Sequence, residues 1–593
     1  MKKTITALLA LAMVLCLLPL SAAAADVTLE GNFVKITMAE DFSAGECTDL
    51  EPASVGDGAL QLKAGASEGV YVSPIYQTFP WNDLVASWNS DTPRGTSVEI
   101  YGRAYIPDYD GWSNGGETYD GWTDWITWGE WSPFIERGCP QDADSHPSRS
   151  GDKNGWAYAY SFGSAGDSSL NITDGLTATA FQLKAVVRAD GTQTAQPVLR
   201  LVAATFKNTN DPDWWSACSL TEGTGEIPDS VLLDTPSIAQ TIRDPDYGGV
   251  ICSATSMSML LDGQGADVLP EEVALTAFDY GYGGNGNWSF TCAGAGAFGY
   301  ESYVHYASFE GVRQELAAGH AVAMSVKYSN TPEGKYPYLE NAPTNTGGHL
   351  ITIVGYFFSQ ELQEYVYYSN DPATGSDLKT AHREYRESQL SEAWYRRAAY
   401  FVHEKEAGAG DYAREYHQAA LWPVEGQEDV YALIADGQVV QLPVDFMRDP
   451  RENFGAHGTL ALIVPGEEEE AELPEGVRRV TANHDFYFNL FNPTEDGYLK
   501  FTGGLIPELL EQKTPPTIFV IFNSGASYTA TASADAPVYT PGMDLPQPEA
   551  PSADSSTDTA SSFFGGSLVL PIVLLVVLAA AIVAVVLVRK KKH

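Results

Sequence analysis

The sequence predicts an α+β domain in the middle of the chain, flanked by all-β domains and followed by a single C-terminal transmembrane helix. Three observations predict this fold class. Short alternating runs of polar and apolar residues, separated by Gly, Asp and Asn clusters, recur in 26–226 and in 408–536. In 227–405, helical patterns come first and two apolar strand patterns follow. Near the C-terminus, 567–588 is a run of 22 uncharged residues, which is long enough to cross a bilayer core of about 30 Å.

The two ends of the chain predict a secreted protein that stays attached to a membrane. Residues 1–25 combine a basic start, an apolar core and a run of three alanines, as a signal peptide does. The stretch 537–566 is rich in Pro, Ser, Asp and Thr and is typical of a flexible linker. The basic tail 589–593 follows the apolar run directly, so the positive-inside rule places it in the cytoplasm. We therefore expect a single-pass cell-membrane protein whose bulk is extracellular.

The N-terminal region, 26–226, is expected to form a two-sheet β-sandwich. It contains ten of the chain's 13 tryptophans. These rings could form a platform for cell-wall or glycan contact, but packing in the core and between domains is the favoured interpretation, because Trp buries a large area. The region 408–536 reads as a β-rich domain without a catalytic pattern, and a stalk or partner surface is expected there.

Composition excludes some functions. The net charge of −43 argues against nucleic-acid binding. No HExxH, CxxC or phosphate-binding loop motif occurs in the sequence, so we predict no metal site and no cofactor. Removal of the signal peptide leaves five cysteines, and an odd number outside the cell leaves one unpaired. Cys252 is the natural unpaired one, while three pairings remain possible for the others: Cys47, Cys139, Cys218 and Cys292.

The middle region contains the residues for thiolate chemistry in order along the chain. Cys252 follows a glycine turn and opens a helical pattern, where unpaired N–H groups and the helix dipole favour the thiolate. His349 stands at the start of an apolar strand pattern. Asn370 and Asp371 end the next one. A cysteine, a histidine and a polar orienting group are what acyl transfer through a thiolate requires.

Strand geometry predicts how the histidine is oriented. His349 and Asp371 are 22 residues apart, so a hairpin centred near Gln360 brings Asp371 opposite His349 or a neighbour of it. Successive strand residues point to opposite faces, so only one of Asn370 and Asp371 can reach the ring. Two other histidines could compete as the base. His320 fits the cap of a helix end, and His305 lies in an aromatic stretch where packing explains it.

These motifs resemble the papain-like bacteriocin-processing peptidases (family thirty-nine of the cysteine peptidases), in their stand-alone secreted branch. The resemblance covers about 230–402 and rests on Gln240, the Cys252-Ser253-Ala254 helix start, Gly348-His349 and Asn370-Asp371-Pro372. It implies a papain-like α+β fold. It also implies that Cys252 is the nucleophile, His349 the general base and acid, Asp371 the orienting group and Gln240 an oxyanion-hole donor. Asn370 is the alternative orienting group.

Two features depart from the family pattern. Gln240 precedes the cysteine by 12 residues, which is farther than usual, and Ser253-Ala254 replaces the usual Gly-Pro. No ATP-binding cassette follows the domain, which distinguishes the chain from the transporter-fused members.

The sequence thus predicts a membrane-anchored extracellular cysteine peptidase that acts on peptide or protein substrates. Two alternatives stay open. A different acceptor or substrate gives a transpeptidase or an amidase acting on cell-wall peptides. A non-catalytic surface adhesion or binding protein on a papain-like scaffold fits the tryptophan-rich region and the linker equally well.

Overall fold

The computed structural model describes residues 26–547, apart from 55–57, 135–148, 161–167, 193–194, 212, 215–225, 244–247, 267, 280–283, 414, 443–457, 465–479, 482–484, 488–490, 502–516 and 523–525. Within this part, 26–435 and 440–540 form one compact unit. Residues 436–439, which include strand β26 (Gln438–Val439), and 541–547 belong to a second.

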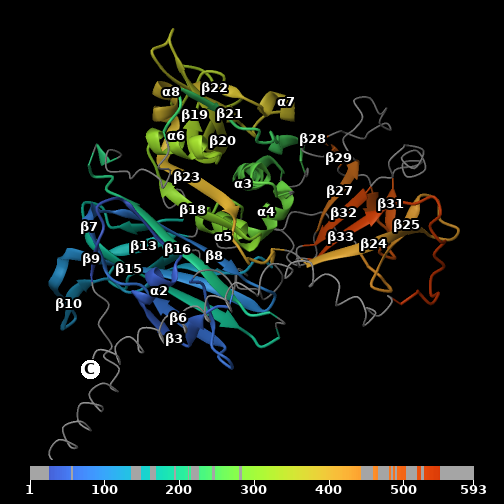
Figure 1. Ribbon diagram of the computed structural model, residues 1–593, viewed down its shortest axis with the longest axis horizontal. Helices are drawn as coiled ribbons and strands as arrows, with labels where there is room; N and C mark the ends of the chain where they lie inside the picture. Colours follow the sequence, from blue (N-terminus) through green and yellow to red (C-terminus); the bar gives the residue numbers. More distant parts are fainter. Residues whose placement is uncertain are drawn as a thin grey trace, which may run out of the picture. The chain divides into compact units, whose positions relative to one another are not determined.

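The N-terminal strands form two sheets (Figure 1). The first contains β1 (Val27–Thr28), β3 (Glu46–Thr48), β6 (Glu68–Val72), β7 (Tyr76–Trp81), β9 (Thr96–Asn114), β10 (Glu117–Trp122), β11 (Ile126–Trp131) and β15 (Ala178–Ala189). The second contains β2 (Phe33–Ile36), β4 (Leu50–Pro52), β5 (Leu60–Leu62), β8 (Asp83–Asp91), β12 (Arg149–Gly151), β13 (Ala157–Tyr160), β14 (Leu170–Ile172) and β16 (Val198–Lys207). A short helix, α2 (Ala39–Ser43), follows β2. The sheets share one core, in which Phe181 of β15 and Phe206 of β16 lie 5.5 Å apart between ring centroids.

The middle region is a sheet with helices on it. The strands run in the order β18 (Tyr300–Tyr306), β23 (Trp394–Lys405), β19 (Val322–Tyr328), β20 (Thr346–Ser359), β21 (Glu364–Asn370) and β22 (Arg383–Arg386), and β17 (Ser230–Leu232) also pairs with β20. Between β17 and β18 come η2 (Gln240–Ile242), η3 (Gly248–Val250), α3 (Cys252–Gly263), α4 (Pro270–Thr276) and α5 (Trp288–Ala297). The others are α6 (Phe309–Ala318), α7 (Asp377–Thr380) and α8 (Glu387–Ala393). Helix α3 packs on β19 and β20, which positions its first residue near the strand that contains His349 (Figure 1).

Tryptophans from the N-terminal sheets pack in the core and against the middle region. Trp81, Trp88, Trp128 and Trp131 are all buried. Trp88 meets Phe290 of α5 edge to face at 5.9 Å, and the Trp131 ring N–H donates to the Thr276 carbonyl oxygen at 3.0 Å. For these four tryptophans the contacts are those of packing, which is the interpretation that the sequence favoured.

The C-terminal strands form a further sheet in the order β28 (Val480–Thr481), β29 (Asp485–Tyr487), β27 (Gly458–Val464), β32 (Thr517–Phe522), β33 (Ala526–Thr531), β24 (Glu415–Pro423), β25 (Val430–Ala435), β31 (Leu499–Phe501) and β30 (Phe491–Pro493). Strands β24 and β33 pair in parallel.

The predicted fold class was wrong for the chain as a whole. Most of the described secondary structure is β-sheet, because long runs of aromatic and β-branched residues form strands such as β20 and β23. Within the described residues, no helix is both long and apolar enough to cross a membrane. The predicted single-pass membrane location, with its extracellular bulk, is corrected by the same finding. The segments behind these predictions, 1–25, 567–588 and 589–593, lie outside the described residues, as does most of the linker 537–566.

Candidate active site

Cys252 is the first residue of α3, and only Ile251 separates it from the glycine turn of η3. A side chain at Gly248 would come within 2.8 Å of the Gln240 carbonyl oxygen, so the turn needs a glycine there. Ile251 at the N-cap offers no side-chain acceptor to the first-turn N–H groups, and the positive end of the helix is left for the sulfur. Cys252 is partly exposed, whereas Ile251 and Ser253 are buried.

His349 lies in β20 between the cysteine and a carboxylate. Its Nε2 atom is 2.9 Å from Oδ1 of Asp371. A hydrogen bond also joins the imidazole to the Cys252 side chain. Because Nε2 is occupied by Asp371, Nδ1 is the nitrogen left for the sulfur. The ring is 5% exposed and meets the Tyr328 ring edge to face at 5.9 Å, which fixes its plane.

Asp371, directly after β21, is fully buried and held by four donors. Besides His349, the Ala373 N–H donates to Oδ1 at 3.1 Å. The Tyr328 and Tyr385 hydroxyls donate to Oδ2 at 2.9 and 2.8 Å. Sequence reasoning missed both tyrosines. They reach Asp371 from β19 and β22, on either side of the β20–β21 pair, and nothing local in the sequence indicates that sheet order.

The hairpin register differs from the predicted one by two residues. Thr352 pairs with Asn370, which puts Asp371 level with Ile351 rather than His349. A shift of two keeps side chains on the same face, whereas a shift of one would reverse them. His349 and Asp371 therefore meet as diagonal neighbours, a separation that long side chains can bridge.

Asn370 points away from the histidine. Its Nδ2 donates to the Thr235 and Pro236 carbonyl oxygens, each at 3.1 Å. Its Oδ1 accepts from the His382 N–H at 3.1 Å. Asn370 therefore ties the segment before η2 to the sheet.

Gln240 joins the aspartate loop to the cysteine turn. Its backbone N–H donates to the Pro372 carbonyl oxygen at 2.9 Å, and its Nε2 donates to the Gly249 carbonyl oxygen at 3.0 Å. The side chain is 5% exposed, and within the described part of the chain its buried Oε1 has no hydrogen-bond partner. The bond to Gly249 fixes which way the amide points, and one N–H of the Nε2 group is left over.

Electrostatics favour a charged pair. Burial raises the pKa of Cys252, but the hydrogen bond and charge of His349 and the Leu350 N–H outweigh it, so the thiol pKa falls below its ordinary value. Burial lowers the pKa of His349, but Asp371 and Cys252 together raise it to about 10. Burial likewise raises the pKa of Asp371. The charge of His349 and the hydrogen bonds that Asp371 accepts outweigh burial, so the pKa of Asp371 falls below its usual range. Together these shifts favour thiolate, imidazolium and carboxylate.

The competing histidines lie on other elements. His305 of β18 packs with Phe33 and Phe401, at centroid distances of 4.5 and 5.6 Å. Burial lowers the pKa of His305 to about 4, as expected of a neutral core residue. His320 follows α6 and bonds to Glu315 and Glu404, so its surroundings are carboxylates rather than a simple helix cap.

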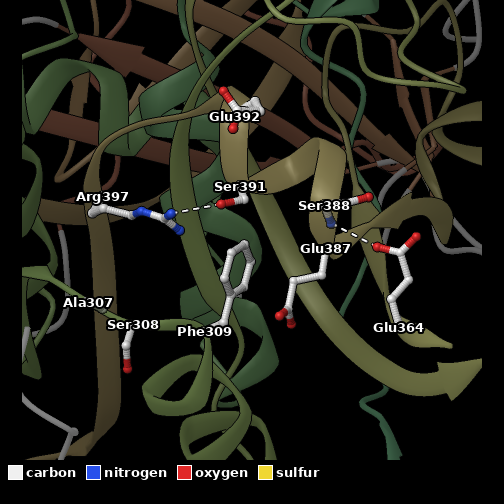
Figure 2. A pocket seen from close by; sticks show the side chains of 9 residues that line it. All are labelled: Ala307, Ser308, Phe309, Glu364, Glu387, Ser388, Ser391, Glu392 and Arg397. Atoms are coloured by element: carbon white, nitrogen blue, oxygen red, sulfur yellow. Dashed lines mark hydrogen bonds between the residues drawn. The ribbon is translucent and has the colours of Figure 1, made fainter. Parts of the chain in front are cut away.

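A cavity of about 590 Å³ lies away from these residues (Figure 2). Its wall includes Phe309, Glu387 and Arg397, and Arg397 donates to Ser391 at 2.8 Å. None of Cys252, His349, Asp371 or Gln240 lines it.

Comparison with known families identifies this segment. Residues 232–401 match the model of the Peptidase_C39 like family, and they include Gln240, Cys252, His349 and Asp371. The predicted resemblance is confirmed at this level. The segment is a C39-like, papain-like cysteine peptidase domain, a hydrolase class whose substrates are peptides or proteins. The match covers less than a third of the chain, and the secreted branch stays a prediction. No curated protein matches the chain.

Proposed function

We propose that this protein cleaves peptide bonds through Cys252, His349 and Asp371. The observation that carries the proposal is one imidazole held by a buried carboxylate at 2.9 Å and hydrogen-bonded to a partly exposed cysteine at a helix start. In the domain order that we propose, the peptidase occupies 227–405, between a β-sandwich at 26–226 and a β-rich domain at 408–536. Each sheet has its strands inside one of these ranges, which supports the boundaries.

The first half-reaction forms a thioester. The Cys252 thiolate attacks the carbonyl carbon of the substrate, and the carbonyl electron pair moves onto oxygen. The His349 imidazolium gives its proton to the leaving amine as the C–N bond breaks, and the acyl group remains on sulfur. The neutral imidazole then takes a proton from water, which attacks the thioester and releases the acid and the thiolate.

The remaining residues of the site orient the histidine and bind the oxyanion. Asp371 keeps the imidazole oriented and stabilises its protonated form. Tyr328 and Tyr385 hold the carboxylate in place, and burial raises the pKa of both hydroxyls, so they remain donors. For the oxyanion we propose the Cys252 N–H and the remaining N–H of Gln240.

The test uses the full chain with an epoxide inhibitor of papain-like enzymes and a peptide-library substrate. We expect one adduct, located on Cys252 by mass spectrometry, together with peptide hydrolysis. Cys252→Ala should lose both, and the matched variant Cys292→Ala should keep both. A folded parent protein that neither forms the adduct nor cleaves any peptide would refute the function.

A further inference from the structure

A second cluster of histidine and carboxylate groups lies between α6 and β23. Glu315 Oε2 is 3.1 Å from His320 Nδ1 and 3.0 Å from His403 Nε2. These three donor atoms all lie within 4.8 Å of one another. The Glu315 side chain is 2% exposed, and each imidazole is 14% exposed, so one buried carboxylate meets two rings that solvent can reach.

The other nitrogen of each imidazole also contacts a carboxylate. His320 Nε2 lies 3.2 Å from Glu404 Oε1, and His403 Nδ1 lies 2.8 Å from Glu301 Oε1. Glu301 is itself fixed by Lys35 Nζ at 2.9 Å. A carboxylate on the outer nitrogen is the usual support of a metal-binding histidine, since it fixes the tautomer and makes the inner nitrogen a better ligand.

The spacing suits a small divalent ion. With ligand distances of about 2.0–2.1 Å, tetrahedral zinc sets neighbouring donor atoms about 3.3 Å apart. The two donor separations that involve Glu315, 3.0 and 3.1 Å, are close to this value. Two imidazole nitrogens and one carboxylate oxygen form a ligand set that proteins use for zinc with an open fourth position.

We propose that Glu315 Oε2, His320 Nδ1 and His403 Nε2 bind one divalent transition-metal ion, Zn²⁺ first among them. The ion would cross-link α6, the turn after it and β23. Its ligands are up to 88 residues apart in the sequence, so no short sequence motif indicates the site. It is separate from the Cys252 site along the shared neighbour β19. His349 pairs with Val326 near one end of β19, whereas His403 lies two residues beyond Phe401, which pairs with Val322 at the other end. Metal binding to the folded state would raise stability by mass action.

The test measures Zn²⁺ binding to the full chain by calorimetry, in a Cys252→Ala background that removes the thiolate as a competing ligand. We expect one strongly bound ion. His320→Gln and His403→Gln should each weaken binding by more than about a hundredfold. Glu301→Gln, which removes only an outer carboxylate, should cost about 10–100-fold. His417→Gln is the matched control, because His417 stacks on Tyr528 in another sheet, and it should bind Zn²⁺ as the parent does.

A second measurement needs no variant of the cluster. Bound Zn²⁺ should protect His320 and His403, but not His417, from acylation by diethyl pyrocarbonate. Bound Co²⁺ should show d–d bands without a thiolate charge-transfer band. The alternative explanation of the cluster is that His320 and His403 are protonated and contact these carboxylates without a metal. Failure of the folded chain to bind Zn²⁺, or binding that leaves both histidines unprotected, would therefore overturn the proposal.

Discussion

Two cysteines of the peptidase domain are both helical, yet their surroundings drive their thiols in opposite directions. Cys252 is the first residue of α3, partly exposed and hydrogen-bonded to His349. Cys292 lies inside α5 and is fully buried. Burial raises the pKa of both thiols. It brings the Cys292 pKa to about 12, whereas His349 reverses the effect at Cys252.

The difference teaches that neither burial nor a helix is enough to make a cysteine reactive. Inside a helix the backbone N–H groups are already paired, and at the first turn they are available. An imidazolium supplies the positive charge that the thiolate needs in a site of low polarity. We infer that the reactivity of Cys252 requires both the helix start and the histidine. The variants below remove one part of the site at a time and so test the contrast with Cys292.

The largest expected effect comes from removing each sulfur in turn. Cys252→Ala should reduce peptide hydrolysis to the background rate, because Cys252 is the thiol that is hydrogen-bonded to His349. Cys292→Ala should keep turnover and lose about 1 kcal/mol of stability, as a small change in a packed core does. Steady-state kinetics and thermal melting measure the two effects. Loss of turnover in a folded Cys292→Ala protein would contradict the account.

Next in size is Gln240→Ala. Removal of one oxyanion donor costs about 3 kcal/mol of transition-state stabilisation, or roughly a hundredfold in kcat. Loss of the bond to Gly249 should lower stability by only about 1 kcal/mol. Normal kcat in this variant would mean that another group binds the oxyanion, and that Gln240 only holds the turn.

Asp371→Asn tests the charge behind the histidine. Burial alone lowers the pKa of His349, and the carboxylate is the main group that raises it to about 10. Without that charge the imidazolium proton is lost at lower pH, so the alkaline limb of the pH–rate profile should move to lower pH. Asn370→Ala is the matched control. It should lower the melting temperature, since Asn370 binds two backbone carbonyl oxygens, and leave the alkaline limb in place.

The smallest expected effect is that of Tyr385→Phe. Asp371 loses one donor, keeps Tyr328 and stays ionised, so stability should fall by about 1 kcal/mol. A less stabilised carboxylate holds the imidazolium at least as well as before. The alkaline limb should therefore not move to lower pH, in contrast to Asp371→Asn. The pH–rate profiles of the two variants, measured side by side, check this sign.

Part of the site could be predicted from the sequence because it depends on local patterns. The glycine turn placed Cys252 at a helix start, and strand parity allowed only one of Asn370 and Asp371 to reach His349. The family resemblance favoured Asp371, which is the residue that contacts the ring. Their catalytic roles stay predictions. The exact register could not be predicted, because it depends on a turn in which Gln363 adopts a positive φ of 55°. Tyr328, Tyr385 and the Glu315 cluster depend on sheet order and on distant pairings, which no local pattern contains.

The central claim is that Cys252 is a thiolate paired with the His349 imidazolium, and its alkylation rate as a function of pH tests it most directly. Iodoacetamide labelling of the full chain, followed by mass spectrometry, gives separate rates for Cys252, Cys292 and the exposed Cys47. We predict that Cys252 reacts fastest at neutral pH and keeps reacting at pH values where Cys47 is protonated. In His349→Ala this advantage should disappear. A Cys252 curve that superimposes on that of Cys47 in the parent protein would contradict the account.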